Sequence, residues 1–191
     1  MLSMSSTAII IKAFDDLNMT KETEKFYEVF CKKTQSKNGM WEQRFYTDGT
    51  LAPCWGYQID ETASVIYGIY EHYKVTKDIK FLSNNLKMCE NAMHFLLKYL
   101  ENIFNEKEEQ DLVKKEIEEK VREEGREKDK IYKHASYDLW EMNEGVHLYS
   151  ISSIYGAFNA MLGIYEVIKP KYENNRLKLE QISKNIVKME T

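Results

Sequence analysis

Proline and glycine are scarce in this chain of 191 residues, which contains only two prolines and eight glycines. Both residues interrupt regular structure, so their scarcity favours long helices joined by few tight turns. Alternation of apolar and polar residues, the pattern of a half-buried strand, does not extend over a useful length. The sequence therefore predicts an all-α fold in one domain, whether complete or part of a larger one.

Cysteine is also rare, and its spacing argues against two kinds of site. Cys31, Cys54 and Cys89 form neither a CxxC metal pattern nor a full set of disulfides. His72 and His94 likewise have no partner at metal-ligand spacing. We therefore predict reduced, buried thiols in a cytoplasmic protein with no metal and no other cofactor.

The chain lacks three further features that would identify a class of protein. Its net charge is −4 and no basic face stands out, which argues against a nucleic-acid partner because phosphates demand clustered Lys and Arg. No apolar run approaches the roughly 18 residues that suggest a membrane span. The first six residues have neither the charged start nor the apolar stretch of a signal peptide.

Apolar residues recur at helical spacing in six segments, which pair as three antiparallel hairpins. We expect Ser5, Ser6 or Thr7 to cap the first helix, Thr20 the second and Asp60 the third. The predicted helices cover residues 6–17, 20–35, 60–74, 76 or 78 to 103, 150–169 and 171–188.

Two stretches depart from this pattern. Residues 36–60 contain turn dipeptides and many aromatic side chains, which favours a functional loop over a plain linker. Residues 105–130 carry eleven acids and eight bases around a narrow apolar seam. We interpret this charge run as an inserted helix that packs along one edge or projects from the domain, with a coiled-coil partner helix as the alternative.

Residues 136–149 hold the densest mixture of acidic and aromatic side chains. Asp138 and Glu141 flank Trp140, and Gly145 and His147 follow before the next helix. Carboxylates among aromatic rings suit a sugar-cleaving site, because rings stack on the apolar faces of pyranoses and a desolvated acid can hold a proton. The alternative is a loop that caps a helix and buries a tryptophan.

The segment from Ser136 to Glu141, followed by Gly145-Val146-His147, resembles the acid-bearing segment of glucoamylase-like enzymes, glycoside hydrolase family fifteen. A second segment supports the resemblance, because Asp48-Gly49, Trp55-Gly56 and Gln58-x-Asp60-Glu61 look like the sugar-binding loop of that family. The order and separation of both segments fit, over roughly residues 6–170. The family fold is an (α/α)6 toroid of six helical hairpins, so three hairpins correspond to about half a toroid.

The resemblance also implies roles for individual residues. Family members invert the anomeric centre with one carboxylic acid and one carboxylate base on opposite faces of the bond. Glu141 lies at the position of the general acid, and Asp138 at that of a supporting acid. The matching pocket and loop residues are Trp140, Trp55, Gln58 and Asp60.

Three departures from the family pattern limit the expected activity. Met142 stands where the family often has a second glutamate, and Glu144 is the candidate substitute for its sugar contact. The arginine–aspartate segment that holds the terminal sugar would precede residue 1, and the general base would follow residue 191. We therefore expect descent from an enzyme that removes terminal glucose from α-glucans or α-glucosides, and no hydrolytic competence in the isolated chain.

Two other classes of function remain open at this point. The chain is either an enzyme segment or a non-catalytic helical module that binds a glycan or a partner chain with the same face. A structural or assembly protein is the second alternative, because half a toroid leaves an apolar wall that a second copy or the rest of the toroid would cover. A generic helical repeat would not explain why acids cluster with tryptophans.

Overall fold

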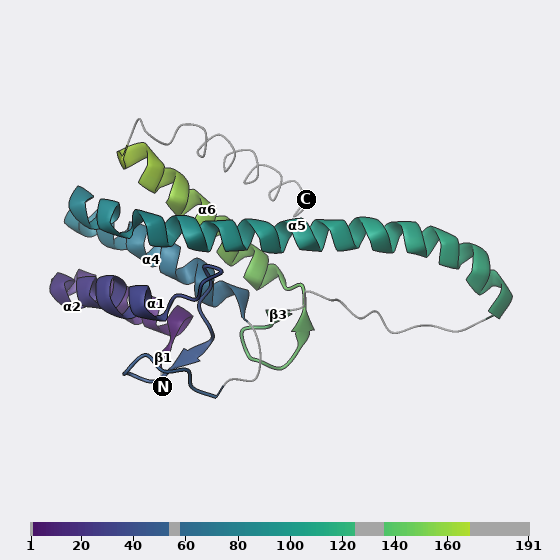
Figure 1. Cartoon of the computed structure of the whole chain (residues 1–191), viewed down its shortest axis with the longest axis horizontal. Coiled ribbons are helices and arrows are strands. Elements are labelled where there is room, and N and C mark those ends of the chain that lie inside the picture. The colour runs from purple at the N-terminus through teal and green to yellow at the C-terminus, as the bar shows by residue number, and fades with distance from the viewer. Residues whose placement is uncertain (1, 54–57, 125–135, 169–191) are drawn as a thin grey trace.

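The computed structural model of the chain describes residues 2–53, 58–124 and 136–168 (Figure 1). Helices dominate these residues, so the predicted all-α fold is confirmed. The strands in this part of the chain are two residues long and form two antiparallel pairs. They are β1 (Leu2–Ser3) with β2 (Arg44–Phe45), and β3 (Ser136–Tyr137) with β4 (Glu144–Gly145).

The first hairpin begins with α1 (Met4–Asp16) and returns through α2 (Thr20–Lys25), the π-helical turn η1 (Phe26–Cys31) and α3 (Lys32–Thr34). Ser3 caps α1, because its Oγ accepts a hydrogen bond from the backbone N–H of Ser6 at 3.3 Å. The predicted caps at residues 5–7 are therefore wrong. Thr20 is the first helical residue of α2 rather than its cap.

The second hairpin pairs α4 (Ile59–Thr76) with α5 (Ile79–Glu124). Gln58 occupies the cap position of α4, so the prediction that Asp60 caps this helix is wrong. Asp60 instead lies in the first helical turn, where its charge suits the positive end of the helix dipole. Asp78 does cap α5, because its Oδ1 accepts the backbone N–H groups of Lys80 at 2.8 Å and Phe81 at 3.1 Å.

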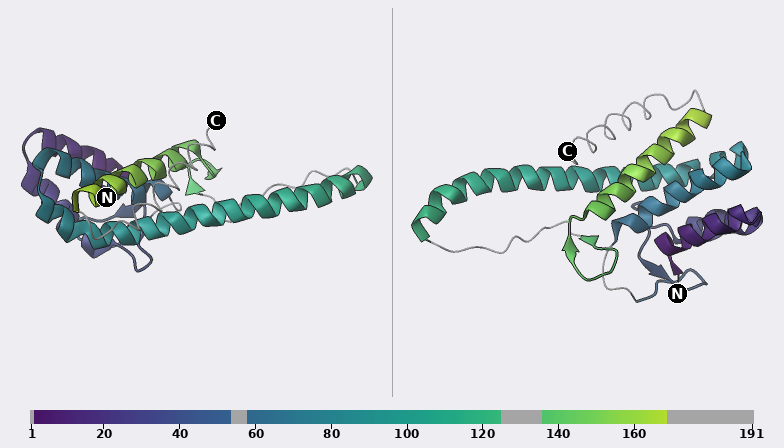
Figure 2. Two further views of the ribbon diagram at one scale, coloured as in Figure 1. Left: turned by 90° about the horizontal axis from the view of Figure 1, so that it is seen from above. Right: turned by 180° about the vertical axis from the view of Figure 1, so that it is seen from behind.

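α5 continues without a break into the charge run as far as Glu124. Figures 1 and 2 show that its C-terminal part extends away from the other labelled helices. Residues 105–124 are helical, as predicted for the charge run. Residues 125–130 of the predicted insertion lie outside the described residues.

α6 (Leu148–Ile168) follows the second strand pair and packs against α4 and α5. Gly163 permits a close approach of α6 to α4, because a Cβ there would lie 2.2 Å from Cζ of Tyr70. Among the described helices, α6 alone is long and apolar enough to cross a membrane by length and composition. α6 contributes buried residues to the hydrophobic core, including Ile154, Phe158 and Met161. A core helix meets the same length and composition test. The helix predicted for 171–188 lies outside the described residues.

α4 is the central helix of the core. It packs against α1, α5 and α6, and even polar residues such as Thr62 and His72 on it are buried. In Figure 1, α1, α4 and α6 run in the same direction, and their N-terminal ends lie beside β1 and β3. This arrangement places the loops ahead of the three helices at one end of the molecule. The half toroid stays a prediction.

Candidate site at the N-terminal ends of three helices

Two long-range hydrogen bonds join the segments that precede α1, α4 and α6. Ser3 Oγ, ahead of α1, donates to Glu61 Oε1 in the first turn of α4 at 3.0 Å. The backbone N–H of Ile59, the first residue of α4, donates at 3.4 Å to Oγ of Ser136, which lies in the strand pair ahead of α6. The predicted site residues of the described chain therefore gather at one end of the bundle.

Residues 136–145 form an antiparallel hairpin, here called the acid hairpin. Its register pairs Ser136 with Gly145 and Tyr137 with Glu144. At its tip, the N–H of Asp138 donates to the carbonyl of Asn143 at 2.9 Å, and the N–H of Glu141 donates to the carbonyl of Asp138 at 3.0 Å. Residues 136–145 are thus a hairpin, and the predicted helix follows it as α6 from Leu148.

Asp138 orders the tip of the acid hairpin. Its carboxylate accepts the backbone N–H of Met142 at 2.8 Å and the side-chain amide of Asn143 at 2.9 Å. These hydrogen bonds, that of the Asn143 side chain first, lower the pKa of Asp138 below its usual value. The carboxylate is therefore charged at neutral pH, and it stabilises the turn that carries Glu141. The role of Asp138 as a supporting acid stays a prediction.

Glu141 has an unusual backbone and a charged partner. Its φ is +59°, in the left-handed region that costs a residue other than glycine about 1 kcal/mol. Its Oε1 forms an ion pair with Nη2 of Arg44, which lies 97 residues earlier in the chain. The two side chains are only 20% and 25% exposed, so the pair is held largely away from solvent.

A second contact anchors the acid hairpin through two buried glutamines. Gln43 Nε2 donates to Gln58 Oε1 at 2.8 Å, and Gln58 Nε2 donates to the carbonyl of Asp138 at 2.7 Å. Both glutamines are almost fully buried. The predicted sugar-loop residue Gln58 therefore uses both ends of its amide to position the acid hairpin.

Two further acids lie beneath the hairpin in the first turn of α4. Asp60 and Glu61 are each 1% exposed. Burial, followed by the negative charge of these two carboxylates, raises the pKa of Tyr149 at the start of α6. This end of the molecule therefore carries both buried carboxylates, Asp60 and Glu61, and the exposed carboxylate of Glu144.

The remaining predicted site residues differ in exposure. Trp140 is 80% exposed and Met142 is 78% exposed, so both project from the hairpin tip. Glu144, the candidate substitute for the missing glutamate, lies exposed on β4. Trp55 falls outside the described residues. Contact between these residues and a sugar remains a prediction.

Sequence reasoning missed Arg44 and Gln43. Both lie in the aromatic-rich loop that the sequence marked as functional, and Arg44 follows directly on Gln43 in the chain. Their partners, Glu141 and Gln58, are far away in sequence, and no local periodicity connects positions at such separations. The only available signal was a basic residue in a loop otherwise rich in aromatic and neutral polar groups.

The hairpin tip carries the carboxylate of Glu141 beside the exposed indole of Trp140. Arg44 and Gln58 hold this turn in place. No group of three or more His, Cys, Asp or Glu side chains suited to a metal ion occurs among the residues that the structure describes. The chemistry that these side chains can offer is hydrogen bonding and proton transfer from carboxyls, with an aromatic face for stacking.

Comparison with known proteins finds a similarity to a glycosyl hydrolase. The chain is 29% identical, over 84 residues, to an uncharacterized glycosyl hydrolase of Methanocaldococcus jannaschii. The aligned residues make up 44% of this chain and 13% of that protein. No family model matches the chain, and no solved structure matches it. The similarity supports a glycosidase-like chain without identifying a particular glycosidase family.

Proposed function

We propose that the chain is the acid-bearing part of a glucoamylase-like inverting glycosidase that acts on terminal glucose of α-glucans or α-glucosides. The observation that carries the proposal is Glu141 on an ordered hairpin tip beside the exposed Trp140, tied to the helix ends by Arg44. The similarity to a glycosyl hydrolase supports it. An acid held in place beside a stacking surface is what cleavage of a glycosidic bond requires.

In the proposed reaction, a pyranose ring stacks on Trp140 and its glycosidic oxygen faces Glu141. The carboxyl of Glu141 gives its proton to that oxygen as the bond to C1 breaks. A carboxylate base on the opposite face of the bond takes a proton from the water that attacks C1. Glu141 forms an ion pair with Arg44, so proton donation requires the incoming sugar to displace Arg44 and the freed carboxylate to take up a proton from solvent first.

The second candidate is a glycan-binding or assembly module without hydrolysis. It is favoured by the contacts of Asp138 and Gln58, which are directed at the protein and shape the hairpin. A turn stabilised in this way can present Trp140 to a glycan without any chemical step.

Titration with maltotriose, followed by tryptophan fluorescence and by glucose release, tests both candidates. Trp41 is buried, so its emission is a poor reporter of sugar. Trp55 and Trp140 are the other tryptophans, so the response of Trp140 is the part of the signal that Trp140→Ala removes. Leu17→Ala, an exposed position at the far end of α1, is the control variant. Because we expect the isolated chain to lack its general base, binding without glucose release agrees with both candidates.

If the chain releases glucose, Glu141→Gln separates the two candidates. Glucose release that this variant abolishes while binding persists assigns the enzyme. An emission that does not respond to roughly millimolar maltotriose in the unmodified chain would reject both candidates.

A further inference from the structure

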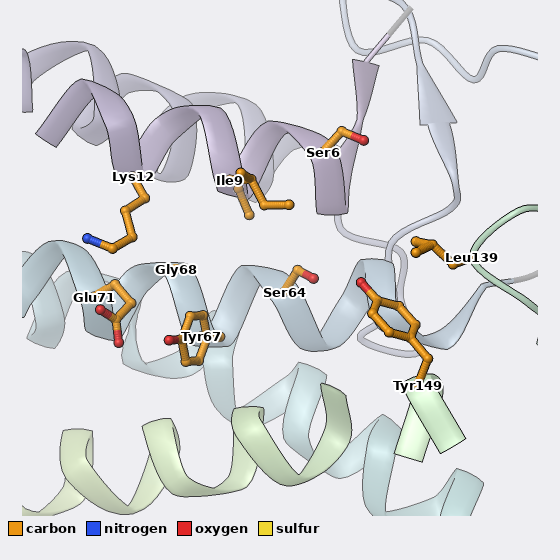
Figure 3. Close-up of a pocket in the computed structure, with 10 residues that line it drawn as sticks. Ser6, Ile9, Lys12, Ser64, Tyr67, Gly68, Glu71, Leu139 and Tyr149 are labelled. Atoms are coloured by element: carbon orange, nitrogen blue, oxygen red, sulfur yellow. The ribbon is translucent and has the colours of Figure 1, made fainter. Parts of the chain in front are cut away.

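A groove of about 290 Å³ lies between α1 and α4 and reaches the acid hairpin. Figure 3 shows Leu139 and Tyr149 at one end of this groove, and Lys12 and Glu71 at the other. Leu139 belongs to the acid hairpin and lies two positions before Glu141 in the chain. The groove therefore begins at the segment that carries the proposed acid.

The side chains that line the groove are mostly apolar, and several of them are open to solvent. Ile9 is 73% exposed, Tyr67 is 46% exposed and Leu139 is 43% exposed. The hydroxyls of Ser6 and Ser64 interrupt this apolar lining. Large apolar side chains around a concave surface are typical of ligand sites, because a ligand that covers them removes apolar area from water. The lining thus favours a ligand with an apolar part.

The charged residues of the groove already have partners. Lys12 pairs with Asp16 at 3.4 Å, and Glu71 pairs with Lys74. Each charge is thus balanced by a neighbour on its own helix, and both lie at the end away from the acid hairpin (Figure 3). The groove therefore has no net charge that would select a phosphate or a charged peptide.

The surface beside Glu141 is apolar as well. Its neighbours in the chain, Trp140 and Met142, are 80% and 78% exposed. The carboxylate of Asp138 is engaged within the turn by the N–H of Met142 and the side-chain amide of Asn143. A general acid gives its proton to the oxygen of the leaving group, so the leaving group lies beside these side chains. Apolar neighbours suit an apolar leaving group better than a second sugar, whose hydroxyls need polar partners.

We propose that the substrate is an α-glucoside whose leaving group is an alkyl alcohol, with its oxygen at Glu141 and its chain in the groove. The inference rests on the proposed function and selects alkyl α-glucosides within it. A volume near the lower limit of small-molecule sites, about 300 Å³, suits an alkyl chain. The bond between C1 and the oxygen breaks, the oxygen takes the proton of Glu141, and the alcohol leaves. Water supplies the new hydroxyl at C1 and gives its second proton to the base.

The test compares octyl α-glucoside with methyl α-glucoside and maltose by calorimetric titration of the full chain, below the concentration at which the octyl compound forms micelles. We expect octyl α-glucoside to bind at least roughly tenfold more tightly than the other two. Ile9→Ser and Tyr67→Ser should each reduce this gain by at least roughly threefold. The matched control is Ile10→Ser, because Ile10 follows Ile9 on α1, is 54% exposed and does not line the groove.

The outcomes separate this inference from the function on which it rests. Equal binding of the octyl and methyl compounds, tighter binding of maltose, or a gain that survives both serine substitutions overturns the inference. In each of these cases, a tryptophan response to the sugar that Trp140→Ala removes still supports the acid hairpin. Binding of none of the three compounds overturns both proposals.

Two further results would assign the groove to another occupant and overturn the inference. One is 1-octanol that binds as tightly as octyl α-glucoside, which would show an apolar ligand without a sugar. The other is a dimer, seen by light scattering, that Ile9→Ser dissociates while octyl α-glucoside gains nothing over methyl α-glucoside. That result would assign the groove to a second copy of the chain.

Discussion

The ion pair between Arg44 and Glu141 should be a measurable link between two distant parts of the chain. We propose a double-mutant cycle with Arg44→Met, Glu141→Gln and the combined variant, in which methionine keeps an apolar stem at position 44. The free energy of unfolding is measured by urea denaturation with two spectroscopic probes, whose transitions must coincide. The cycle isolates the energy of the pair from other effects of each substitution.

The expected coupling follows from the surroundings of the pair. Solvent-exposed ion pairs contribute about 0–1 kcal/mol, whereas a hydrogen bond to a charged group contributes about 1.5–3 kcal/mol. With side chains 25% and 20% exposed, the pair lies between these limits, so we expect a coupling of about 1–2 kcal/mol. Amide exchange at Met142, whose N–H donates to Asp138, should quicken by roughly 5–30-fold in Arg44→Met.

An exposed ion pair provides the control for this experiment. Lys12 and Asp16 are 46% and 61% exposed, with 3.4 Å between Nζ and Oδ1, and Lys12→Met should change stability by less than about 0.5 kcal/mol. A coupling between Arg44 and Glu141 no larger than this control would refute the view that the pair fixes the acid hairpin. So would unchanged exchange at Met142.

Three other changes test the remaining contacts. Gln58→Leu removes the buried link to the hairpin and should lower the urea-derived stability by about 1–3 kcal/mol; an unchanged midpoint would contradict this. His72→Phe leaves the buried carboxyl of Asp15, 2.8 Å from His72 Nδ1 in the native chain, without that partner, and should cost about 1–3 kcal/mol in thermal unfolding. The pKa of Asp138 is lowered on folding, so its stabilisation of the hairpin is present above about pH 4 and lost as the pH falls through the folded-state pKa. Trp140 emission should report this acid transition, and Asp138→Asn should abolish it.

Helix positions could be predicted because apolar spacing encodes them, but several boundaries could not, and two of them show why. Aspartate is favourable both as the cap of a helix and in its first turn. The sequence therefore does not show which of these two positions Asp60 occupies. The predicted end near residue 103 followed from the loss of apolar periodicity. The helix continues to Glu124 because residues 79–124 contain neither glycine nor proline and are rich in Glu and Lys.

The candidate site was predictable only in its local part. Asp138, Trp140 and Glu141 are neighbours in sequence, and their chemistry is visible without a fold. The turn that Asp138 stabilises and the left-handed backbone of Glu141 depend on hydrogen bonds within the hairpin that composition does not reveal. Arg44 could not be assigned, because only the fold brings it to Glu141.

Adjacent residues 43 and 44 determine how the acid hairpin is held. Gln43 reaches the hairpin backbone through Gln58, whereas Arg44 reaches the side chain of Glu141 directly. β2 is itself fixed, because Arg44 pairs with Ser3 in the strand ladder and its carbonyl accepts the N–H of Ala52 at 3.1 Å. The backbone and the carboxyl of the hairpin therefore share one anchor. A sugar that displaces Arg44 from Glu141 can free the carboxyl for chemistry while the glutamine contact keeps the hairpin backbone in place.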